Sequence, residues 1–321
     1  MCMWKNKKVL VAGGEGFIGK NLALKLRSLG ANVSITTHAS HHNNTALHDG
    51  EFYNMPCDLL DKSQCEWVTH KQDYVFMCAA VTHGAKAMKE DPMSMLVPST
   101  IINTLMIDAA YKNNVEKFIF ISSSVVYPDL GITPVKEEDT TNSEPPEIYY
   151  HLGYMKKYAE ALCRSYHKLG KTKYNVIRPA NIFGPYDDFQ PETSHMAAAL
   201  IKKVAERQTP FEIWGNGEDI RDILYIDDLI NGIILTAEKI NDFQPINISY
   251  GKGYSVKEIL ESLFDIESFY PKVIFNTNKP SMLKTRYIDN SLAKKLLGFV
   301  PENDIHFALA KTLEWYKNDN N

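Results

Sequence analysis

The chain has 321 residues, which is too long for one minimal domain and short for three. Hydrophobic residues make up 44% of it and charged residues 23%, as in an ordinary soluble globular enzyme that buries a large core without disulfides. The formal net charge of −4, with no dominant basic block, argues against nucleic acid as a partner.

Cysteine usage and apolar runs bear on the compartment. An odd number of cysteines without a CxxC motif favours reduced thiols in a cytoplasmic protein. The cysteines are Cys2, Cys57, Cys65, Cys78 and Cys163. The apolar run at 9–12 is too short for a signal-peptide core, and no window approaches the length of a membrane span. No group of His, Cys and acidic residues has the spacing of metal ligands, so we expect no bound metal. Because no window is long enough to span a membrane, we expect no membrane contact.

Strands and helices alternate along the first half of the chain. Strands are expected at 8–12, 32–37, 73–78, 117–122 and 176–179, and helices at 17–29, about 101–113 and 149–169. This alternation predicts an α/β fold, a Rossmann-type doubly wound parallel sheet covered on both faces.

The second half has shorter, more irregular segments. Helices are expected there at 195–207, 226–238, 256–264, 291–297 and 306–317. We therefore expect a dinucleotide-binding domain at 1–180, with some core elements returning from later segments. A smaller mixed α/β domain at 181–321 would mainly bind the substrate.

A glycine-rich loop directly follows the first strand and opens the first helix. Gly13, Gly16 and Gly19 have the spacing G-x-x-G-x-x-G. Glycine permits the tight turn and lets backbone N–H groups approach a diphosphate at the positive end of a helix. In this strand–loop–helix context, the loop predicts dinucleotide binding rather than a merely structural turn.

The end of the second strand bears on the choice of dinucleotide. An acid there favours NAD by accepting hydrogen bonds from the ribose 2′-OH, but 36–42 contains neither an acid nor an arginine. Neutral donors such as His38 could accommodate a 2′-phosphate, so the sequence favours NADP while leaving NAD open. Asp58 is either an adenine contact or a solvated turn carboxylate.

Five motifs along the chain are GGEGFIG at 13–19, SSSVVYP at 122–128, RPANIFGPYDDFQPETSH at 178–195, WGNGEDIRDILYIDD at 214–228 and KPSMLKTRYID at 279–289. Together they resemble the extended short-chain dehydrogenase/reductase family of NAD-dependent epimerases and dehydratases, and its GDP-L-fucose synthase branch in particular. The resemblance implies hydride transfer at C4 of a nucleotide sugar, with a GDP-linked hexose or heptose expected. It also implies a homodimer formed through the helices near 101 and from 149.

The family's catalytic tyrosine is missing from this chain. The resemblance implies a Tyr-x-x-x-Lys pair on the long helix, where the ammonium lowers the phenol pKa for proton exchange with the sugar oxygen. Lys156 matches the lysine, but Leu152 stands in the tyrosine position, and no tyrosine in the chain has lysine four residues later. Tyr149 lies seven residues before Lys156. The proton would pass through Lys156, Ser124 and an ordered water, or through a repositioned tyrosine.

A second departure concerns epimerisation. Ser124 or Ser123 matches the family's catalytic serine, but Val125 stands where the fucose synthases carry an acid/base cysteine. His195 matches the histidine partner of that cysteine. Epimerisation by two bases is therefore in doubt.

The resemblance also implies binding residues. The expected cofactor contacts are Gly13, Gly16, Phe17, Ile18, Gly19, His38, Asp58, Leu59, Ala79, Ala80 and Lys156. The expected substrate contacts are Asn181, His195, Trp214, Arg221 and Arg286, the arginines for phosphate oxygens. Two alternatives stay open: Arg221 could pair with Asp219 or Asp222, and Trp214 could pack in the core. The acidic run at 137–139 is expected to be a solvated loop.

Two other functions compete with the oxidoreductase. One is an epimerase in which enolisation dominates, supported by His195 and opposed by Val125. The other is a non-catalytic cofactor- or sugar-binding homologue inactivated by the replacement at Leu152.

Overall fold

The computed structural model describes residues 3–38, 52–81, 91–191, 193–278 and 283–319. Its largest feature is a seven-stranded sheet with the order β11-β6-β5-β4-β1-β2-β3, in which every neighbouring pair is parallel. The strands are β1 (Lys8–Ala12), β2 (Asn32–Thr37), β3 (Tyr53–Pro56), β4 (Tyr74–Met77), β5 (Lys117–Ile121), β6 (Lys173–Pro179) and β11 (Pro245–Ile248). The predicted doubly wound α/β fold is confirmed.

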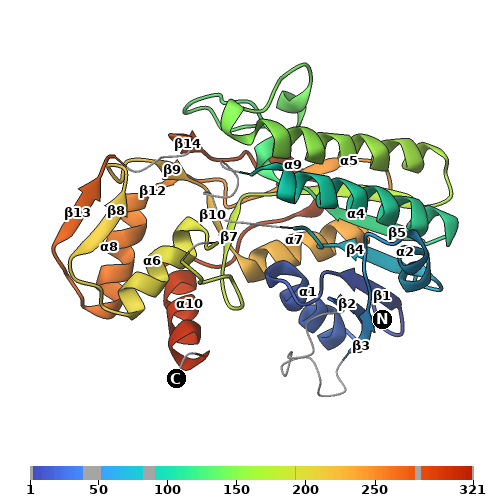
Figure 1. Ribbon diagram of the computed structural model, residues 1–321, viewed down its shortest axis with the longest axis horizontal. Helices are drawn as coiled ribbons and strands as arrows, with labels where there is room; N and C mark the ends of the chain where they lie inside the picture. Colours follow the sequence, from blue (N-terminus) through green and yellow to red (C-terminus); the bar gives the residue numbers. More distant parts are fainter. Residues whose placement is uncertain (1–2, 39–51, 82–90, 192, 279–282, 320–321) are drawn as a thin grey trace.

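Helices cover both faces of this sheet (Figure 1). One layer contains α1 (Phe17–Ser28) and α7 (Ile226–Lys239). The other contains α2 (Lys62–Thr69), α4 (Met93–Lys112) and α5 (Tyr150–Lys168). Alternate residues of β1 enter the two cores, as the twofold period of a strand requires.

The smaller lobe lies at the left of Figure 1. Its strands are β7 (Asn181–Phe183), β8 (Phe211–Trp214), β9 (Ile220–Arg221), β10 (Ile223–Tyr225), β12 (Tyr254–Ser255), β13 (Val273–Asn276) and β14 (Thr285–Arg286). Its helices are α6 (Met196–Ala205), α8 (Val256–Glu267) and α10 (Ile305–Asp319), whereas α9 (Ser291–Leu297) packs against α7 and β11 of the large sheet. The division at residue 180 stays a prediction, and β11 is a later segment that returns to the large sheet beside β6.

Strand β3 and helix α2 are among the short elements that the sequence did not predict. Strand β3 has four residues, and α2 has eight, of which only Cys65, Val68 and Thr69 are buried. So short an apolar stripe gives little periodicity to detect. Helix α2 is started instead by its N-cap, since the Asp61 carboxylate accepts the Gln64 N–H at 3.0 Å.

The expectation that no apolar window approaches the length of a membrane span was wrong. Helix α4 begins at Met93 rather than near Ile101 and continues through Pro98 for 20 residues, with a mean hydropathy of 1.3 over an 18-residue window. By length and composition alone it could cross a membrane. It packs between α2 and α5 on the sheet, and a helix that covers a sheet passes the same test, so the evidence for a membrane span is weak.

Candidate functional site

The glycine loop is held in close contact with its surroundings. Gly13 has φ +79°, and a Cβ there would lie 2.7 Å from the backbone nitrogen of Ala79. A Cβ on Gly19 would lie 2.1 Å from the carbonyl oxygen of Gly13. The Gly13 N–H also donates to Thr36 Oγ1 at 2.8 Å, which ties the loop to β2. Side chains at these two positions are therefore excluded sterically.

The N-terminus of α1 is suited to an anion. Its N-cap is Gly16, which provides no side-chain cap, and the first turn contains no acidic residue. The first backbone N–H groups of a helix lack intrahelical partners and carry the positive end of the dipole. These features fit the diphosphate of a dinucleotide.

The other expected cofactor residues follow neighbouring parallel strands. His38 follows β2, Asp58 and Leu59 follow β3, and Ala79 and Ala80 follow β4. All therefore lie at the carboxyl-end edge of the sheet, where open α/β sheets bind ligands. Asp58 is exposed, and its Oδ1 accepts the Leu60 N–H at 2.9 Å, as a turn carboxylate does. His41 and His42, which follow His38 in the sequence, lie outside the described residues.

Lys156 comes to the same edge from α5. Its side chain is buried, Nζ donates to the Ile121 carbonyl at 2.9 Å and lies 4.8 Å from the centre of the Phe120 ring. Burial lowers the pKa of this ammonium to about 8, against the attraction of the Glu160 carboxylate. Lys156 is thus fixed beside the end of β5, where the serines begin.

The serine loop contains a short 3-10 helix, η2 (Ser124–Val126). Ser123 is its N-cap and accepts the Val125 N–H at 3.3 Å, while Ser124 is buried. A Cβ on Gly153 would lie 2.7 Å from the Val125 carbonyl oxygen, so α5 packs directly against this loop. Gly153, which no sequence motif indicated, therefore lets the helix that carries Lys156 approach the loop that carries Ser124.

A buried polar network supports the loop from below. The Arg178 guanidinium contacts Glu160 Oε2 at 2.6 Å and Tyr127 Oη at 3.1 Å, and Ser122 Oγ donates to Glu160 Oε1 at 2.5 Å. Glu137 belongs to this network, since its carbonyl accepts a hydrogen bond from Arg178 Nη1 at 3.0 Å, while its Oε1 accepts the Asn247 N–H at 2.8 Å. The expectation that 137–139 is a solvated loop was wrong for Glu137, which is buried in the 3-10 helix η3 (Glu137–Thr140). Burial raises the pKa of the Glu137 carboxyl.

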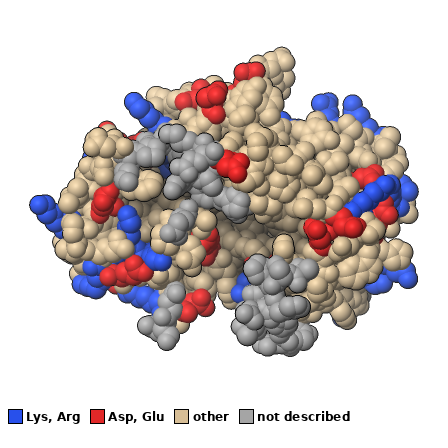
Figure 2. All heavy atoms as spheres, viewed as in Figure 1, with Lys and Arg blue, Asp and Glu red and all other residues tan. Residues whose placement is uncertain are grey.

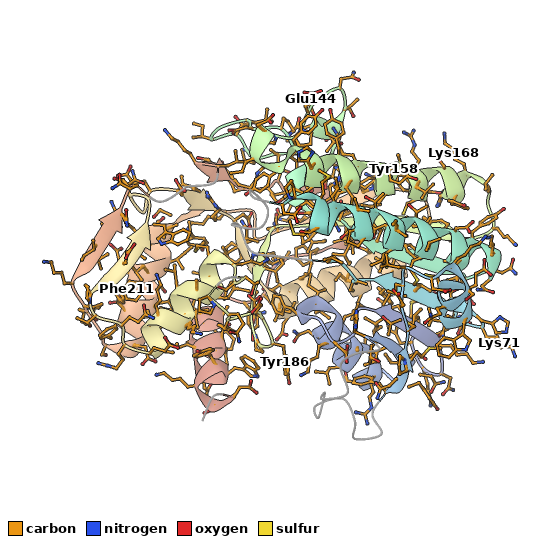
Figure 3. The ribbon with its side chains drawn as sticks, in the orientation of Figure 1. Lys71, Glu144, Tyr158, Lys168, Tyr186 and Phe211 are labelled. Carbon is orange, nitrogen blue, oxygen red and sulfur yellow. The ribbon has the colours of Figure 1, made fainter. Side chains whose placement is uncertain are left out.

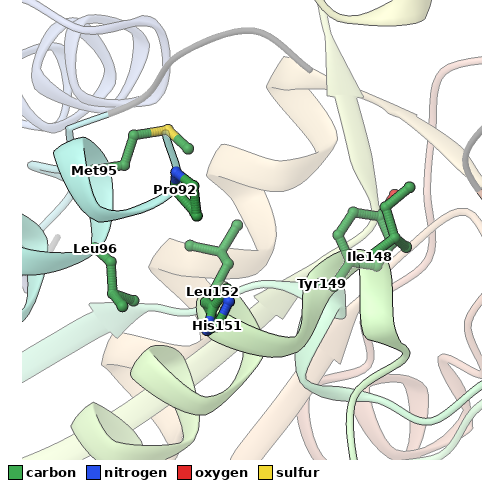
Figure 4. A pocket seen from close by; sticks show the side chains of 7 residues that line it. All are labelled: Pro92, Met95, Leu96, Ile148, Tyr149, His151 and Leu152. Carbon is green, nitrogen blue, oxygen red and sulfur yellow. The ribbon is translucent and has the colours of Figure 1, made fainter. Parts of the chain in front are cut away.

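The tyrosine position of the family is apolar in this chain. Leu152 lines a pocket whose other residues are Pro92, Met95, Leu96, Ile148, Tyr149 and His151. In Figure 4 the Leu152 side chain points toward the start of α4, and Tyr149 lies on the other side of the pocket. No group at residue 152 can exchange a proton.

The two arginines expected to bind phosphate have different surroundings. Arg221 forms an ion pair with Asp219 at 3.3 Å, which is one of the alternatives left open by the sequence. Arg286 is only 7% exposed, and its Nη1 donates to the Ser124 carbonyl at 3.1 Å. The Arg286 Cζ lies 5.9 Å from the centre of the Tyr149 ring. Arg286 thus contacts both the serine loop and the start of α5.

The remaining expected substrate residues lie on the smaller lobe. Asn181 is exposed, and its amide donates to the Asp222 carbonyl at 3.2 Å. Trp214 is 54% exposed at the end of β8, so the core-packing alternative was wrong. His195 is the N-cap residue of α6 and is exposed at the surface. The surrounding protein atoms lower the pKa of its imidazole, and the Asp188 carboxylate raises it.

The loop after β7 connects the two lobes. Tyr186 has φ 68°, its ring lies 3.9 Å from Lys20 Nζ of α1 and 5.0 Å from the Trp315 ring of α10 (Figure 3). The face seen in Figure 2 is hollowed where the lobes meet, and its Lys and Arg side chains are scattered rather than gathered in one patch.

Comparison with known proteins gives consistent matches over nearly the whole chain. Residues 9–249 match the model of the NAD dependent epimerase/dehydratase family. A putative GDP-L-fucose synthase 2 of Arabidopsis thaliana is 27% identical over 97% of this chain and 92% of its own length. GDP-mannose 3,5-epimerase of the same plant is 29% identical over 98% of this chain and 83% of its own.

A solved structure extends the match. UDP-N-acetylglucosamine 4-epimerase from Methanobrevibacter ruminantium superposes with a TM-score of 0.84 at 27% identity, covering 98% of this chain and 99% of that one. The resemblance that the sequence motifs predicted is confirmed.

Three residues of interest were missed by sequence reasoning. Glu160 and Gly153 belong to none of the sequence motifs that indicated the site. Glu15 stands inside GGEGFIG, but only the structure shows where its carboxylate goes, namely to the His38 N–H at 2.9 Å.

Proposed function

Since the chain belongs to the NAD dependent epimerase/dehydratase family, we propose that it is an NAD(P)-dependent oxidoreductase acting at C4 of a nucleotide sugar, with a GDP-linked 4-keto hexose or heptose as substrate. One observation supports the proposal: the glycine loop after β1 and the serine loop after β5 lie at the same carboxyl-end edge of the sheet, where Lys156 Nζ donates to the Ile121 carbonyl. The GDP-sugar assignment is supported by the names of the two plant relatives.

The roles of the residues follow from their chemistry. The N–H groups at the start of α1 would hold the diphosphate, and Lys156 would bind the nicotinamide ribose. A bound nicotinamide supplies or accepts the hydride. Ser124 would donate a hydrogen bond to the sugar oxygen, and Arg221 and Arg286 would contact the nucleotide phosphates.

The test is consumption of reduced nicotinamide when purified protein meets a GDP-4-keto-6-deoxyhexose. Lys156→Met should lower the rate by roughly 10²-fold or more. Lys168→Met is the matched control, because Lys168 is exposed at the end of α5 (Figure 3) and should leave the rate unchanged. A wild-type protein that binds no dinucleotide and turns over no nucleotide sugar contradicts the proposal.

An epimerase that works mainly by enolisation is the second candidate, supported by His195 at the start of α6. It predicts that solvent deuterium enters the sugar at C3 or C5. Hydride transfer without such exchange removes this candidate, while exchange without net reduction favours it.

We also propose that the chain forms a homodimer. Met93, Val97 and Ile101 lie four residues apart on α4 and are 44%, 52% and 41% exposed; on the adjacent α5, Tyr154 and Tyr158 are 37% and 47% exposed. Such a continuous apolar face suits burial against its counterpart in a second copy. Ile101→Glu should convert a dimer to a monomer in light scattering after size-exclusion chromatography, whereas Ile132→Glu, at an exposed site away from this face, should not.

A cytoplasmic location is proposed on the cysteines. Cys57, Cys65, Cys78 and Cys163 are free thiols within the described residues. Such thiols are typical of a reducing compartment. Fractionation of the source cells, followed by immunodetection, tests this.

A further inference from the structure

The first inference concerns the choice between NAD and NADP, and it rests on the proposed dinucleotide site. Two hydrogen bonds join the glycine loop to the end of β2: the Gly13 N–H donates to Thr36 Oγ1, and the His38 N–H donates to Glu15 Oε2 at 2.9 Å. Glu15 is half-buried, so its carboxylate is held rather than free to swing into solvent. An acid therefore stands at the end of β2, although β2 itself carries none.

That location matters because, in a doubly wound dinucleotide site, the adenosine ribose lies beside the end of β2. A carboxylate there accepts hydrogen bonds from the 2′-OH of NAD. NADP carries instead a 2′-phosphate with a charge of about −1.5 to −2 at neutral pH, which a nearby carboxylate repels.

The segments around β2 and β3 contain no lysine or arginine that could bind this phosphate. No Lys or Arg occurs between Arg27 and Lys62, a stretch that includes all of β2 and β3. Arg27 stands in the last turn of α1, with its guanidinium 5.9 Å from the centre of the Phe52 ring. Binding of NADP would need an arginine or lysine in this region.

We propose that Glu15 is the residue that selects the cofactor and that the chain prefers NAD(H) to NADP(H). This reverses the preference that strand β2 alone suggested. The carboxylate acts from the glycine loop, in place of the acid that usually ends β2.

The experiment is calorimetric titration of the cofactor-stripped full-length protein with NAD⁺ and with NADP⁺. The wild type should bind NAD⁺ at least about tenfold more tightly. Glu15→Gln keeps the acceptor for the His38 N–H but removes the charge, and should tighten NADP⁺ by about tenfold. Glu138→Gln, which removes one exposed carboxylate elsewhere, is the matched control and should leave both constants unchanged.

The outcomes are distinct. Equal or tighter binding of NADP⁺ by the wild type, or an unchanged ratio in Glu15→Gln, overturns the role of Glu15. Binding of neither dinucleotide overturns the proposed function, and this inference with it.

A second, independent observation concerns the phenol that residue 152 lacks. Tyr149 closes η4 (Glu147–Tyr149) directly before α5 and lines the same pocket as Leu152. Its half-buried ring contacts the Arg286 guanidinium, whose other arm reaches the Ser124 carbonyl. Arg286 Nη2 is buried and has no hydrogen-bond partner among the described residues. One buried cation thus links Tyr149 to the serine loop.

Tyr149 stays protonated at neutral pH, as a proton donor must. Burial raises the pKa of the phenol above its usual value, and the positive charges of Arg221 and Arg286 only partly oppose this. No comparable arrangement surrounds Leu152, whose neighbours in the pocket include Pro92, Met95 and Leu96.

We propose that Tyr149 is the proton donor of the proposed reductase, in the role that the family assigns to residue 152. The ketone carbon accepts hydride from the reduced nicotinamide as the carbonyl π pair moves to oxygen. That oxygen takes the proton of Tyr149 Oη, and the resulting phenolate is reprotonated from water.

Three measurements on Tyr149→Phe test this: calorimetric binding of GDP and of the dinucleotide, ultraviolet titration of tyrosinate with the dinucleotide bound, and single-turnover reduction. Binding should stay within about threefold, and single-turnover reduction should slow by roughly 10²–10⁴-fold. The variant should also lose one phenol whose titration responds to the dinucleotide. Tyr150→Phe is the matched control, because Tyr150 is exposed and contacts His151 and Tyr154.

A rate near that of the wild type, or an unchanged tyrosinate titration, overturns the role of Tyr149. A loss fully explained by weaker GDP binding does so too, because Tyr149 would then be a phosphate contact. A wild-type protein whose phenol titration responds to the dinucleotide, but which reduces no nucleotide sugar, contradicts only the proposed reaction.

Discussion

Arg178 and Glu160 form a doubly hydrogen-bonded ion pair inside the protein, with Nη2–Oε2 at 2.6 Å and Nε–Oε1 at 3.0 Å. Their side chains are 4% and 8% exposed. The pair connects β6 to α5 directly beneath the serine loop, because Glu160 also accepts Ser122 Oγ. The floor of the candidate site is therefore polar and fully buried.

Breaking this pair should strongly destabilise the fold. Glu160→Ala leaves a buried guanidinium without its carboxylate, and we expect the free energy of unfolding to fall by about 3–5 kcal/mol in urea denaturation. Glu116→Ala is the matched control, since Glu116 pairs with Lys7 at 2.9 Å at the surface, with 53% of its side chain exposed. That change should cost about 0.2–1 kcal/mol. Equal losses in the two variants contradict the structural role of the buried pair.

The glycine loop should not tolerate a methyl group at Gly19. In an ordinary helix, Gly→Ala stabilises by about 1 kcal/mol, but here the Cβ would meet the Gly13 carbonyl oxygen at 2.1 Å. We expect Gly19→Ala to weaken dinucleotide binding by about tenfold or more in calorimetry. Gly170→Ala, in a loop where nothing lies within 4 Å of the added Cβ, should leave binding unaltered. Unchanged affinity in Gly19→Ala would show that the loop does not hold the dinucleotide.

His195 should be uncharged at neutral pH. The surrounding protein lowers the pKa of its imidazole below the usual 6.5, while Asp188 raises it. Because the folded pKa is depressed, the stability linked to His195 is present above pH 6.5 and is lost as the pH falls through the folded pKa. Asp188→Asn should lower that pKa further. Side-chain NMR titration measures it, with His195→Gln to assign the signal, and an upward shift in Asp188→Asn contradicts the assigned geometry.

Restoring the family tyrosine should not restore a family site. Leu152→Tyr would place a phenol among the apolar pocket residues Pro92, Met95 and Leu96, where its hydroxyl finds little support. If Tyr149 is the proton donor, the reduction rate should change by no more than about threefold. Leu152→Phe is the size-matched control. A large gain confined to Leu152→Tyr would instead point to a decayed site.

Much of the large sheet could be predicted because its strands are buried on both faces. The apolar runs at β1, β2 and β5 end within a residue of where they were expected, and the long amphipathic α5 was found almost whole. The start of α4 was missed because Pro98 reads as a helix end, although the helix continues through it. Strand β11 was missed as a partner of β6, because a pairing across so many residues leaves no local pattern.

The sequence by itself determined the family, the spacing of the glycine loop and the absence of a phenol at Leu152, because these depend on residue identity at fixed spacing. Only the tertiary structure decided that Glu15 stands at the end of β2, that Glu137 is buried and that Arg286 joins Tyr149 to the serine loop. Each of these contacts joins side chains from separate elements. Their direction is set by packing, which no local periodicity encodes.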